Sequence, residues 1–519
     1  MKYSLFILAI FIHVNSSFCQ SFQIDWRNCF GHIGIDEAND VVKTNSGYYI
    51  LGTANERDIW LIKTDLEGNH LWDKKFGGSK ADYSISLIPI SNAQFYIVGA
   101  SLSSDGDVTY DPYPNSPDYW IVKIDSSGNK IWDKIYGGNM TDQVWSGCYS
   151  ANDEVVIAGW SDSNDGDVLL NYGIFDMWVL KLDSTGNKVW NTIIGTDGQD
   201  IPYTIKQTSD KGYITGGTSL SITQPSGNIP CVDPYKQSEM VITKLDSLGN
   251  IEWSRCYGGS ENEALLEIIE LSDGYLAACT TSSNDGDLLN SGYHIGYWNS
   301  GAPTADTWIV KLDFEGNIQW QKCYGGSKHE SPSKIFLTEK GYRVFNTADS
   351  HDGDVVGNNS ITDDYPDIWT FEIDSVGNLL SGQCFGDLYD ESIFNGVFKI
   401  SDAQYAIACQ SITFAWSCVE EFDIVLFKIT DTLFINTNVN PFPSQVKVYP
   451  NPAHSGINFE NSQGMPLLIT VFDALGIKKE EFLLSPGNNA ITIDNYSPGV
   501  YHYQYSYKGI PVTGKFVVY

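Results

Sequence analysis

The sequence predicts an all-β protein built from a repeated unit. A fifteen-residue phrase, DIWLIKTDLEGNHLW in its first copy, returns about every sixty residues along the chain. Its copies occupy 58–72, 118–132, 176–190, 239–253, 306–320 and 367–381, and a shorter copy occupies 423–431. A period of this length is typical of solenoids and propellers, in which each repeat is one supersecondary unit.

Each repeat is predicted to hold four short antiparallel strands. In 118–136, side chains alternate between two faces on both sides of a polar turn at 126–129, which is the pattern of a β-hairpin. Two further alternating runs lie upstream of each phrase, as at 84–101 and 397–411. Four strands per unit and seven units predict a seven-bladed β-propeller.

The two ends of the repeat region favour a closed ring. The last copy, at 423–431, is not followed by the strand that follows the earlier copies. Segment 22–31 can supply it, because Trp26, Cys29 and Phe30 have the same spacing as the equivalent residues of the repeat. We therefore expect this N-terminal strand to complete the seventh blade, which removes two exposed sheet edges.

Residues 1–19 are predicted to be a secretory signal peptide. Lys2 precedes an apolar run at 5–14 that is too short to span a bilayer. Ser17 and Cys19 fit the small-residue rule for cleavage before Gln20, and lipidation of Cys19 is the alternative. No other segment is long and apolar enough to be a transmembrane segment, so we expect an exported, soluble chain.

The charge balance argues against a nucleic-acid partner. The chain has 31 basic and 64 acidic residues, a formal net charge of −33 and a pI near 4.4. A phosphate backbone needs clustered Lys and Arg, and here they are few and dispersed. An acidic surface suits solubility and divalent cations.

The cysteines predict mainly buried thiols. Nine remain after signal cleavage, and an odd number argues against a fully paired disulfide framework. Four of them occupy a repeat position that holds an isoleucine in another copy, and are expected to be buried as small apolar side chains: Cys29, Cys256, Cys323 and Cys384. The others can pair in part: Cys148, Cys231, Cys279, Cys409 and Cys418.

Segment 125–132, DSSGNKIW, resembles the tryptophan-docking repeat of quinoprotein-type propellers. In that repeat an Asp and a Gly precede a Trp that packs on the neighbouring blade, although here the Asp-to-Gly spacing is one residue shorter. The resemblance implies blade packing by Trp72, Trp132, Trp190, Trp253 and Trp320. It does not extend to a quinone cofactor.

The last 74 residues resemble the C-terminal sorting domain of type IX secretion in Gram-negative bacteria, the Por secretion tail. The matching pieces are VKVYPNPA at 446–453, ITVFDALGIKKEE at 469–481, SPGVYHYQY at 497–505 and GKFVVY at 514–519. Alternating strands and Pro/Gly turns predict a small β-sandwich, separated from the propeller at 20–431 by a linker at 432–445. The resemblance implies recognition by the type IX machinery and a secreted or surface-attached protein.

Four of the loops between second and third strands contain Asp-Gly-Asp. They provide eight candidate calcium ligands: Asp105, Asp107, Asp165, Asp167, Asp285, Asp287, Asp352 and Asp354. Calcium takes six to eight oxygen ligands, which carboxylates around a glycine can supply in part. The alternative is a turn without a metal, and the lack of a full twelve-residue calcium loop favours it.

The same loops carry aromatic residues and are expected to lie on one face of the ring. The candidate ligand-binding residues are Tyr113, Tyr172, Tyr297, Trp298, Tyr365 and Trp416. Exposed rings beside carboxylates can stack on a sugar or anchor a protein partner. The alternative is that the rings fold back and cover the ends of the blades.

The leading functional hypothesis is a non-enzymatic binding or adhesion protein whose ligand is a glycan or a protein. No zinc-binding His or Cys pair and no nucleophile elbow is present in the sequence. A first alternative is a glycosidase or lyase that uses a pair of loop carboxylates. A second is a structural component of a surface layer.

Overall fold

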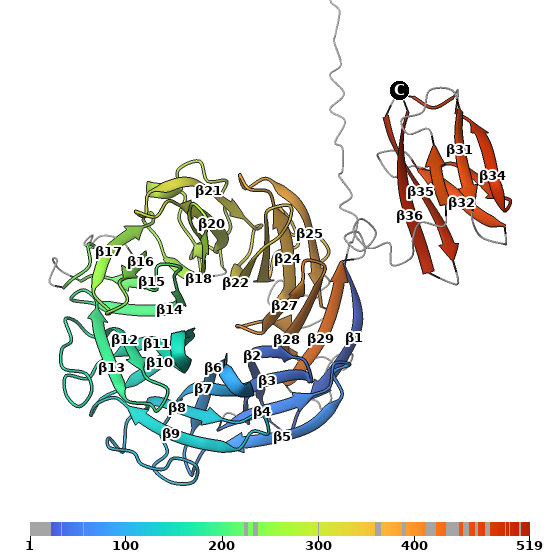
Figure 1. Cartoon of the computed structure of the whole chain (residues 1–519). Coiled ribbons are helices and arrows are strands. Elements are labelled where there is room, and N and C mark those ends of the chain that lie inside the picture. The colour runs from blue at the N-terminus through green and yellow to red at the C-terminus, as the bar shows by residue number, and fades with distance from the viewer. Residues whose placement is uncertain are drawn as a thin grey trace, which may run out of the picture. The chain divides into compact units, whose positions relative to one another are not determined.

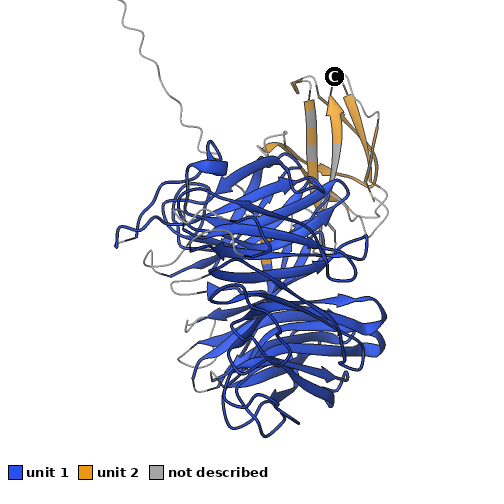
Figure 2. Ribbon diagram, turned by 90° about the vertical axis from the view of Figure 1, so that its left-hand side faces the viewer, with its two compact units in different colours: residues 1–20, 24–430 blue, residues 21–23, 431–519 orange. Residues whose placement is uncertain are grey.

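The computed structural model of the 519-residue chain describes residues 22–518 with interruptions. The interruptions are 33, 56, 223–226, 232–236, 299, 359–364, 387–390, 412–421, 432–445, 450–455, 462–465, 473–477, 494, 498 and 508–509. The chain divides into unit 1, which contains residues 24–430, and unit 2, which contains residues 431–519 (Figure 2). The predicted signal peptide and linker lie outside the described residues.

Six sheets of unit 1 contain four antiparallel strands each, in sequence order, within the described residues. The first three are β2 (Asp36–Thr44), β3 (Gly47–Ala54), β4 (Asp58–Thr64) and β5 (His70–Phe76); β6 (Asp82–Ile90), β7 (Gln94–Ser101), β8 (Asp118–Ile124) and β9 (Lys130–Tyr136); and β10 (Asp142–Ser150), β11 (Glu154–Ser161), β12 (Asp176–Leu182) and β13 (Lys188–Ile194). The next three are β14 (Gln199–Gln207), β15 (Tyr213–Leu220), β16 (Glu239–Leu245) and β17 (Ile251–Tyr257); β18 (Glu263–Leu271), β19 (Gly274–Thr281), β20 (Asp306–Leu312) and β21 (Ile318–Tyr324); and β22 (Glu330–Leu337), β23 (Tyr342–Ala348), β24 (Asp367–Ile373) and β25 (Leu379–Phe385). Short 3₁₀ turns occur at Ser91–Ala93, Ala151–Asp153 and Gly286–Leu288.

A seventh sheet joins the two ends of unit 1. Its order is β1 (Phe22–Phe30), β29 (Asp423–Asp431), β28 (Gln404–Ser411) and β26 (Glu391–Ser392), and β27 (Val397–Ser401) also pairs with β28. The innermost strand is therefore interrupted between β26 and β27, whereas the other sheets have a continuous inner strand. Strand β1 lies beside β29, the last strand of the repeat region.

The sheets follow one another around a centre, with their first strands innermost (Figure 1). Each inner strand contacts that of the next sheet, and β2 also contacts β27 and β28. Hydrophobic clusters lie between successive sheets, and one of them joins β7 and β8 of the second sheet to β11 and β12 of the third. Sheets of four strands around a centre resemble the blades of a β-propeller.

Tryptophans of the outermost strands contact a glycine of the next sheet. An added Cβ at Gly186, where φ is +77°, would lie 2.9 Å from the indole ring of Trp132. The same contact joins Trp72 to Gly128, Trp190 to Gly249, Trp253 to Gly316 and Trp320 to Gly377. In β1, Trp26 contacts Gly68 of the first sheet in the same way. The expected packing of these tryptophans on the neighbouring sheet is confirmed.

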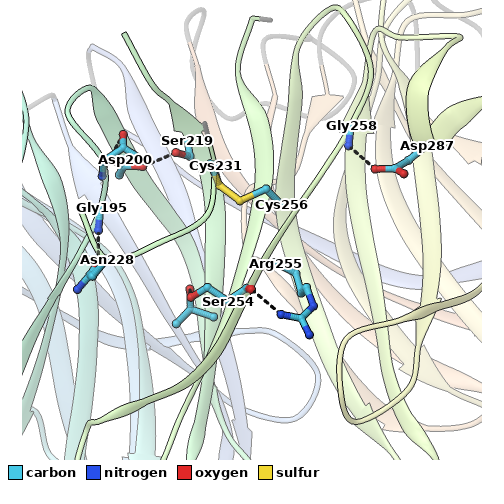
Figure 3. The surroundings of a disulfide bond; sticks show 12 residues. Gly195, Asp200, Ser219, Asn228, Cys231, Ser254, Arg255, Cys256, Gly258 and Asp287 are labelled. Atoms are coloured by element: carbon cyan, nitrogen blue, oxygen red, sulfur yellow. Dashed lines mark hydrogen bonds between the residues drawn. A yellow bond between two sulfur atoms is a disulfide. The ribbon is translucent and has the colours of Figure 1, made fainter. Parts of the chain in front are cut away.

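The cysteine prediction was partly wrong. Cys231 and Cys256 form a disulfide with a Cα–Cα distance of 5.4 Å (Figure 3), and Cys29 is disulfide-bonded too. Cys323 and Cys384 are buried free thiols, as expected. The repeat position predicts a small side chain at Cys256, but its bond depends on Cys231, which lies in the loop between β15 and β16 and is close to Cys256 only in the folded chain.

Unit 2 contains two antiparallel sheets. One is β30 (Val446–Tyr449), β31 (Gly456–Asn461) and β34 (Gly487–Thr492); the other is β33 (Lys478–Leu484), β32 (Leu467–Phe472), β35 (Gly499–Tyr507) and β36 (Ile510–Val518). Phe459, Tyr503 and Phe516 are buried together between them. In the part of the chain that the structure describes, no helix is long and apolar enough to cross a membrane.

Candidate ligand-binding face

The Asp-Gly-Asp loops bind the turns that connect one sheet to the next. In the third sheet, Asp165 Oδ1 accepts the backbone N–H of Asn139 at 2.8 Å, and Asp167 Oδ2 accepts that of Gly137 at 3.2 Å. The backbone N–H of Asp167 donates to the carbonyl of Gly137 at 2.7 Å. Residues 137–139 connect β9 to β10, so the loop holds the connection that leads into its own sheet.

The other three loops repeat this pattern. The first aspartate of each motif accepts a backbone N–H from a serine: Ser79, Ser260 and Ser327. The second aspartate accepts a backbone N–H from a glycine: Gly77, Gly258 and Gly325. Figure 3 shows the bond between Gly258 and Asp287, which is 3.0 Å long. The motif therefore recurs because each connection needs the same acceptors.

These contacts favour the interpretation of Asp-Gly-Asp as a turn. Backbone hydrogen bonds lower the pKa of Asp105 and Asp165, so both carboxyls are charged and already engaged. No group of three or more His, Cys, Asp or Glu side chains is placed to share a metal ion within the described ranges. Calcium binding by the eight aspartates stays a prediction.

An apolar side chain directly after each Asp-Gly-Asp fixes the loop, and the sequence analysis missed it. Val108, Val168, Leu288 and Val355 are all at most 4% exposed. Val108 belongs to the hydrophobic cluster of the second sheet and Leu288 to that of the fifth. An apolar residue at a constant distance after a polar turn is the signal that could have identified this anchor.

Three of the predicted aromatic residues are partly buried. The ring of Tyr113 lies over Gly166 of the next loop, where an added Cβ would be 2.7 Å from its hydroxyl. Tyr172 packs against the cluster between the second and third sheets. Tyr365 is half-buried, and Trp416 lies outside the described residues. Tyr113 thus covers part of the next loop and Tyr172 packs on the hydrophobic cluster, and ligand binding by the six aromatic residues stays a prediction.

Tyr297 and Trp298 differ from these residues because they are exposed on an ordered turn. Their exposed fractions are 62% and 37%. The backbone N–H of Trp298 donates to the carbonyl of Ala302 at 2.8 Å, and its carbonyl accepts the backbone N–H of Gly301 at 2.8 Å. Its ring is also 6.0 Å from the ring of His329, whose pKa is lowered by burial. Tyr297 and Trp298 are therefore exposed aromatic residues beside each other in the loop between β19 and β20.

Pairs of buried carboxyls lie under the connecting turns. An added Cβ at Gly137 would be 2.0 Å from Asp118 Oδ1 and 2.7 Å from Asp142 Oδ2. Burial raises the pKa of both groups, and the charge of Asp142 raises that of Asp118 further. In the next pair along the chain, burial raises the pKa of Asp176 to about 7 and that of Asp200 to about 6.

A cavity of about 370 Å³ lies at the centre of unit 1. We call it the central cavity. It is lined by the first residues of the inner strands β2, β6 and β10, among them Asn39, Tyr83, Gln143 and Trp145, and by Phe394 between β26 and β27. The Asp-Gly-Asp loops bind the turns just before these strands. The cavity therefore lies toward the face of unit 1 that carries these loops, which we call the loop face.

An ionic cluster joins three successive inner strands. Glu267 in β18 accepts Lys206 of β14 at 3.0 Å and Lys334 of β22 at 3.0 Å. Burial alone would raise the pKa of Glu267, but the two lysines lower it to about 2. The three side chains are thus paired with one another and join three successive sheets.

Residues 447–519 match the family described as the secretion system C-terminal sorting domain. The chain therefore carries a type IX sorting domain. Proteins with this domain are exported by type IX secretion to the cell surface or the extracellular space, and this chain is exported by that route. No curated protein sequence matches the chain.

Several solved structures are similar to the chain at low identity. The Neurospora crassa Pan2 WD40 domain is 10% identical, with a TM-score of 0.40, over 76% of this chain and 89% of that chain. The Dos1 propeller is 10% identical, with a TM-score of 0.38, over 75% and 77%. Drosophila Plexin A in complex with Semaphorin 1b is 8% identical, with a TM-score of 0.41, over 80% and 89%. Scores this low support no statement about function.

Proposed function

We propose that the chain is an exported, non-enzymatic binding protein at the bacterial surface. In this proposal residues 20–431 form a seven-bladed β-propeller that β1 closes, after a signal peptide at 1–19. The position of β1 beside β29 and the contact of Trp26 with Gly68 support closure. The sorting domain brings the propeller outside the cell, where the loop face meets its ligand.

The turn at Tyr297 and Trp298 carries this proposal. It lies in the loop between β19 and β20, the longest of its kind among the repeats. Two aromatic rings are exposed there, on residues beside the backbone hydrogen bonds of Trp298, and aromatic side chains are typical anchors of binding surfaces. Acidic loops around them give the face a negative charge, which favours neutral or basic ligands.

Retention on insoluble polysaccharides and on whole cells tests the proposal. The mature chain should be retained by at least one such surface, and Trp298→Ala should weaken retention without changing the unfolding temperature. Phe314→Ala is the matched control, since Phe314 is also an exposed aromatic residue, 42% exposed, in a turn between a third and a fourth strand. Equal retention of both variants would contradict the proposal.

The enzyme and surface-layer hypotheses give other outcomes in the same experiment. Release of soluble oligosaccharide during incubation would indicate a glycosidase or lyase. Such a reaction needs a carboxyl group with a raised pKa. Raised pKa values occur in the buried pairs under the connecting turns, such as Asp118 and Asp142. Hydrogen bonds instead lower the pKa of the loop carboxyl of Asp105. Self-association without any ligand would indicate a structural layer component.

A further inference from the structure

We propose that the central cavity binds a neutral sugar, as a free mono- or disaccharide or as the end of a longer glycan. The inference rests on the proposed function in one respect, namely that the loop face meets a ligand. It adds a second site, lined by inner strands of unit 1, and names the ligand class. At about 370 Å³ the cavity lies within the range that is typical of small-molecule sites.

Aromatic rings form one wall of the cavity. Phe394 is 42% exposed, and its ring centre lies 6.2 Å from that of Trp145. Trp145 is in turn held edge-on by Tyr203 of β14 at 5.3 Å. The faces of such rings suit the C–H groups of a pyranose, which are apolar on one side.

The interruption of the seventh inner strand is what places Phe394 in the cavity. The backbone carbonyl of Phe394 accepts the hydroxyl of Ser333, and Lys334 donates to Asn395 Oδ1 at 3.1 Å. Ile393 donates its N–H to Thr347 at 3.3 Å. Residues of β22 and β23 thus fix the segment between β26 and β27, so the ring is held in position by its neighbours.

Two side-chain amides also line the cavity and are available for hydrogen bonds. Gln143 of β10 and Gln410 of β28 both line the cavity and are half-buried. Neither side chain forms a hydrogen bond with any other residue that the structure describes. An amide offers two donors and an acceptor, and this combination matches the hydroxyl groups of a sugar.

The polar wall between the first two sheets is rigid before any ligand binds. Asn39 Nδ2 donates to both the carbonyl and the hydroxyl of Ser84 at 2.9 Å. Ser84 donates to the carbonyl of Gly52 at 2.8 Å. These buried contacts join the sheets and leave Asn39 Oδ1 as an acceptor beside the cavity, which lowers the cost of ordering the site.

The charge of the lining selects a neutral ligand. Glu37 is the one charged side chain among the described lining residues, and the chain carries a formal net charge of −33. The negative net charge disfavours an anionic ligand such as a phosphate or a uronic acid. Rings, amides, hydroxyls and one carboxylate together leave a neutral sugar as the best chemical match.

Saturation-transfer NMR and calorimetry on the mature full chain test the site. The probes are glucose, galactose, mannose, N-acetylglucosamine, maltose, lactose and cellobiose, each added alone. At least one should bind, and Gln143→Ala combined with Gln410→Ala should weaken it at least about tenfold, since both lost amides are neutral hydrogen-bond partners. Gln319→Ala is the control, because Gln319 is exposed on β21, an outermost strand.

Phe394→Ala gives a second, independent measurement, because it removes the ring that lines the cavity. We expect Phe394→Ala to weaken binding of the same sugar. The unfolding temperature of the two-glutamine variant should be that of the wild type. Binding of no probe, or equal binding by the wild type and both variants, overturns the inference. If no sugar binds in the cavity but retention on polysaccharide still depends on Trp298, the sugar site is refuted and the proposed function stands. If no sugar binds and retention does not depend on Trp298 either, both proposals are refuted.

Discussion

Trp132 of β9 lies against Gly186, which occupies the turn between β12 and β13 of the next sheet. Its indole ring would be 2.9 Å from a Cβ at that position, and the backbone of Gly186 has a positive φ of +77°. Both conditions favour glycine. The contact recurs between successive sheets, so it is a repeated element of the interface between sheets.

Gly186→Ala should lower the free energy of unfolding by about 1–3 kcal/mol, because the new methyl group meets the ring and the left-handed backbone disfavours a side chain. Gly357→Ala is the matched control: φ is +88°, but no described atom lies within 4 Å of the added Cβ. Denaturant unfolding of both variants measures the difference. Equal losses would show that only backbone conformation matters.

The buried carboxyls should make the protein less stable as the pH rises. Burial raises the pKa of Glu330 from its ordinary value of 4.5 to about 8, so between these two pH values the folded state keeps a proton that the unfolded state has lost. The stabilisation is complete below the unfolded pKa and is lost as the pH rises through about 8, with a slope of up to about 1.4 kcal/mol per pH unit.

Glu330→Gln should reduce the dependence of the unfolding free energy on pH, since a glutamine side chain does not titrate. The measurement is denaturant unfolding between about pH 5 and about pH 8, with Glu315→Gln, at an exposed turn, as the control. An unchanged slope in Glu330→Gln would show that the carboxyl is charged in the folded protein.

Asp167→Ala should destabilise the protein by about 1–2 kcal/mol, because Gly137 loses an acceptor and Lys188 loses its partner at 2.5 Å. If the Asp-Gly-Asp loops are turns, the loss should be the same with millimolar calcium and with chelator. A calcium-dependent rise in the unfolding temperature, abolished by replacing Asp107, Asp167, Asp287 and Asp354 with Asn, would instead show metal binding.

Three aromatic residues should separate stability from binding. Trp178→Ala should cost about 3–5 kcal/mol, since this side chain is 0% exposed in the core. Tyr113→Ala should cost about 1–2 kcal/mol, as its ring covers Gly166. Trp298→Ala should change stability least and retention most. A Trp298 variant that unfolds like the Trp178 variant would identify that ring as a structural cover.

Deleting 510–519 should prevent surface display and leave the protein in the periplasm. Residues 510–518 form β36, which pairs along β35 and contributes Phe516 and Val518 to the core of unit 2. Fractionation of cells that express the full-length and truncated chains measures the outcome. A fusion of 446–519 to a periplasmic reporter is the control, and normal display of the truncated chain would contradict the sorting role of this segment.

The sequence predicted the repeated strands well because their alternation is local. The expected place of β1 followed from the strand missing after 423–431 and from the spacing of Trp26, Cys29 and Phe30, and β1 lies beside β29. Other features depend on contacts between distant segments: the Cys231–Cys256 disulfide, the position of Tyr113 over Gly166 and the central cavity. The interruption before Val397 was not predicted, because it depends on the contacts of the residues around Phe394 with β22.

The interrupted inner strand has a consequence for stoichiometry. Repeats of one kind around an axis present equivalent positions, so a ligand that recognised only the repeat would bind in several copies per molecule. Phe394 occurs once and breaks this rotational pseudo-symmetry at the axis. A ligand of the central cavity therefore meets a single asymmetric site, and titration should saturate at one molecule per chain.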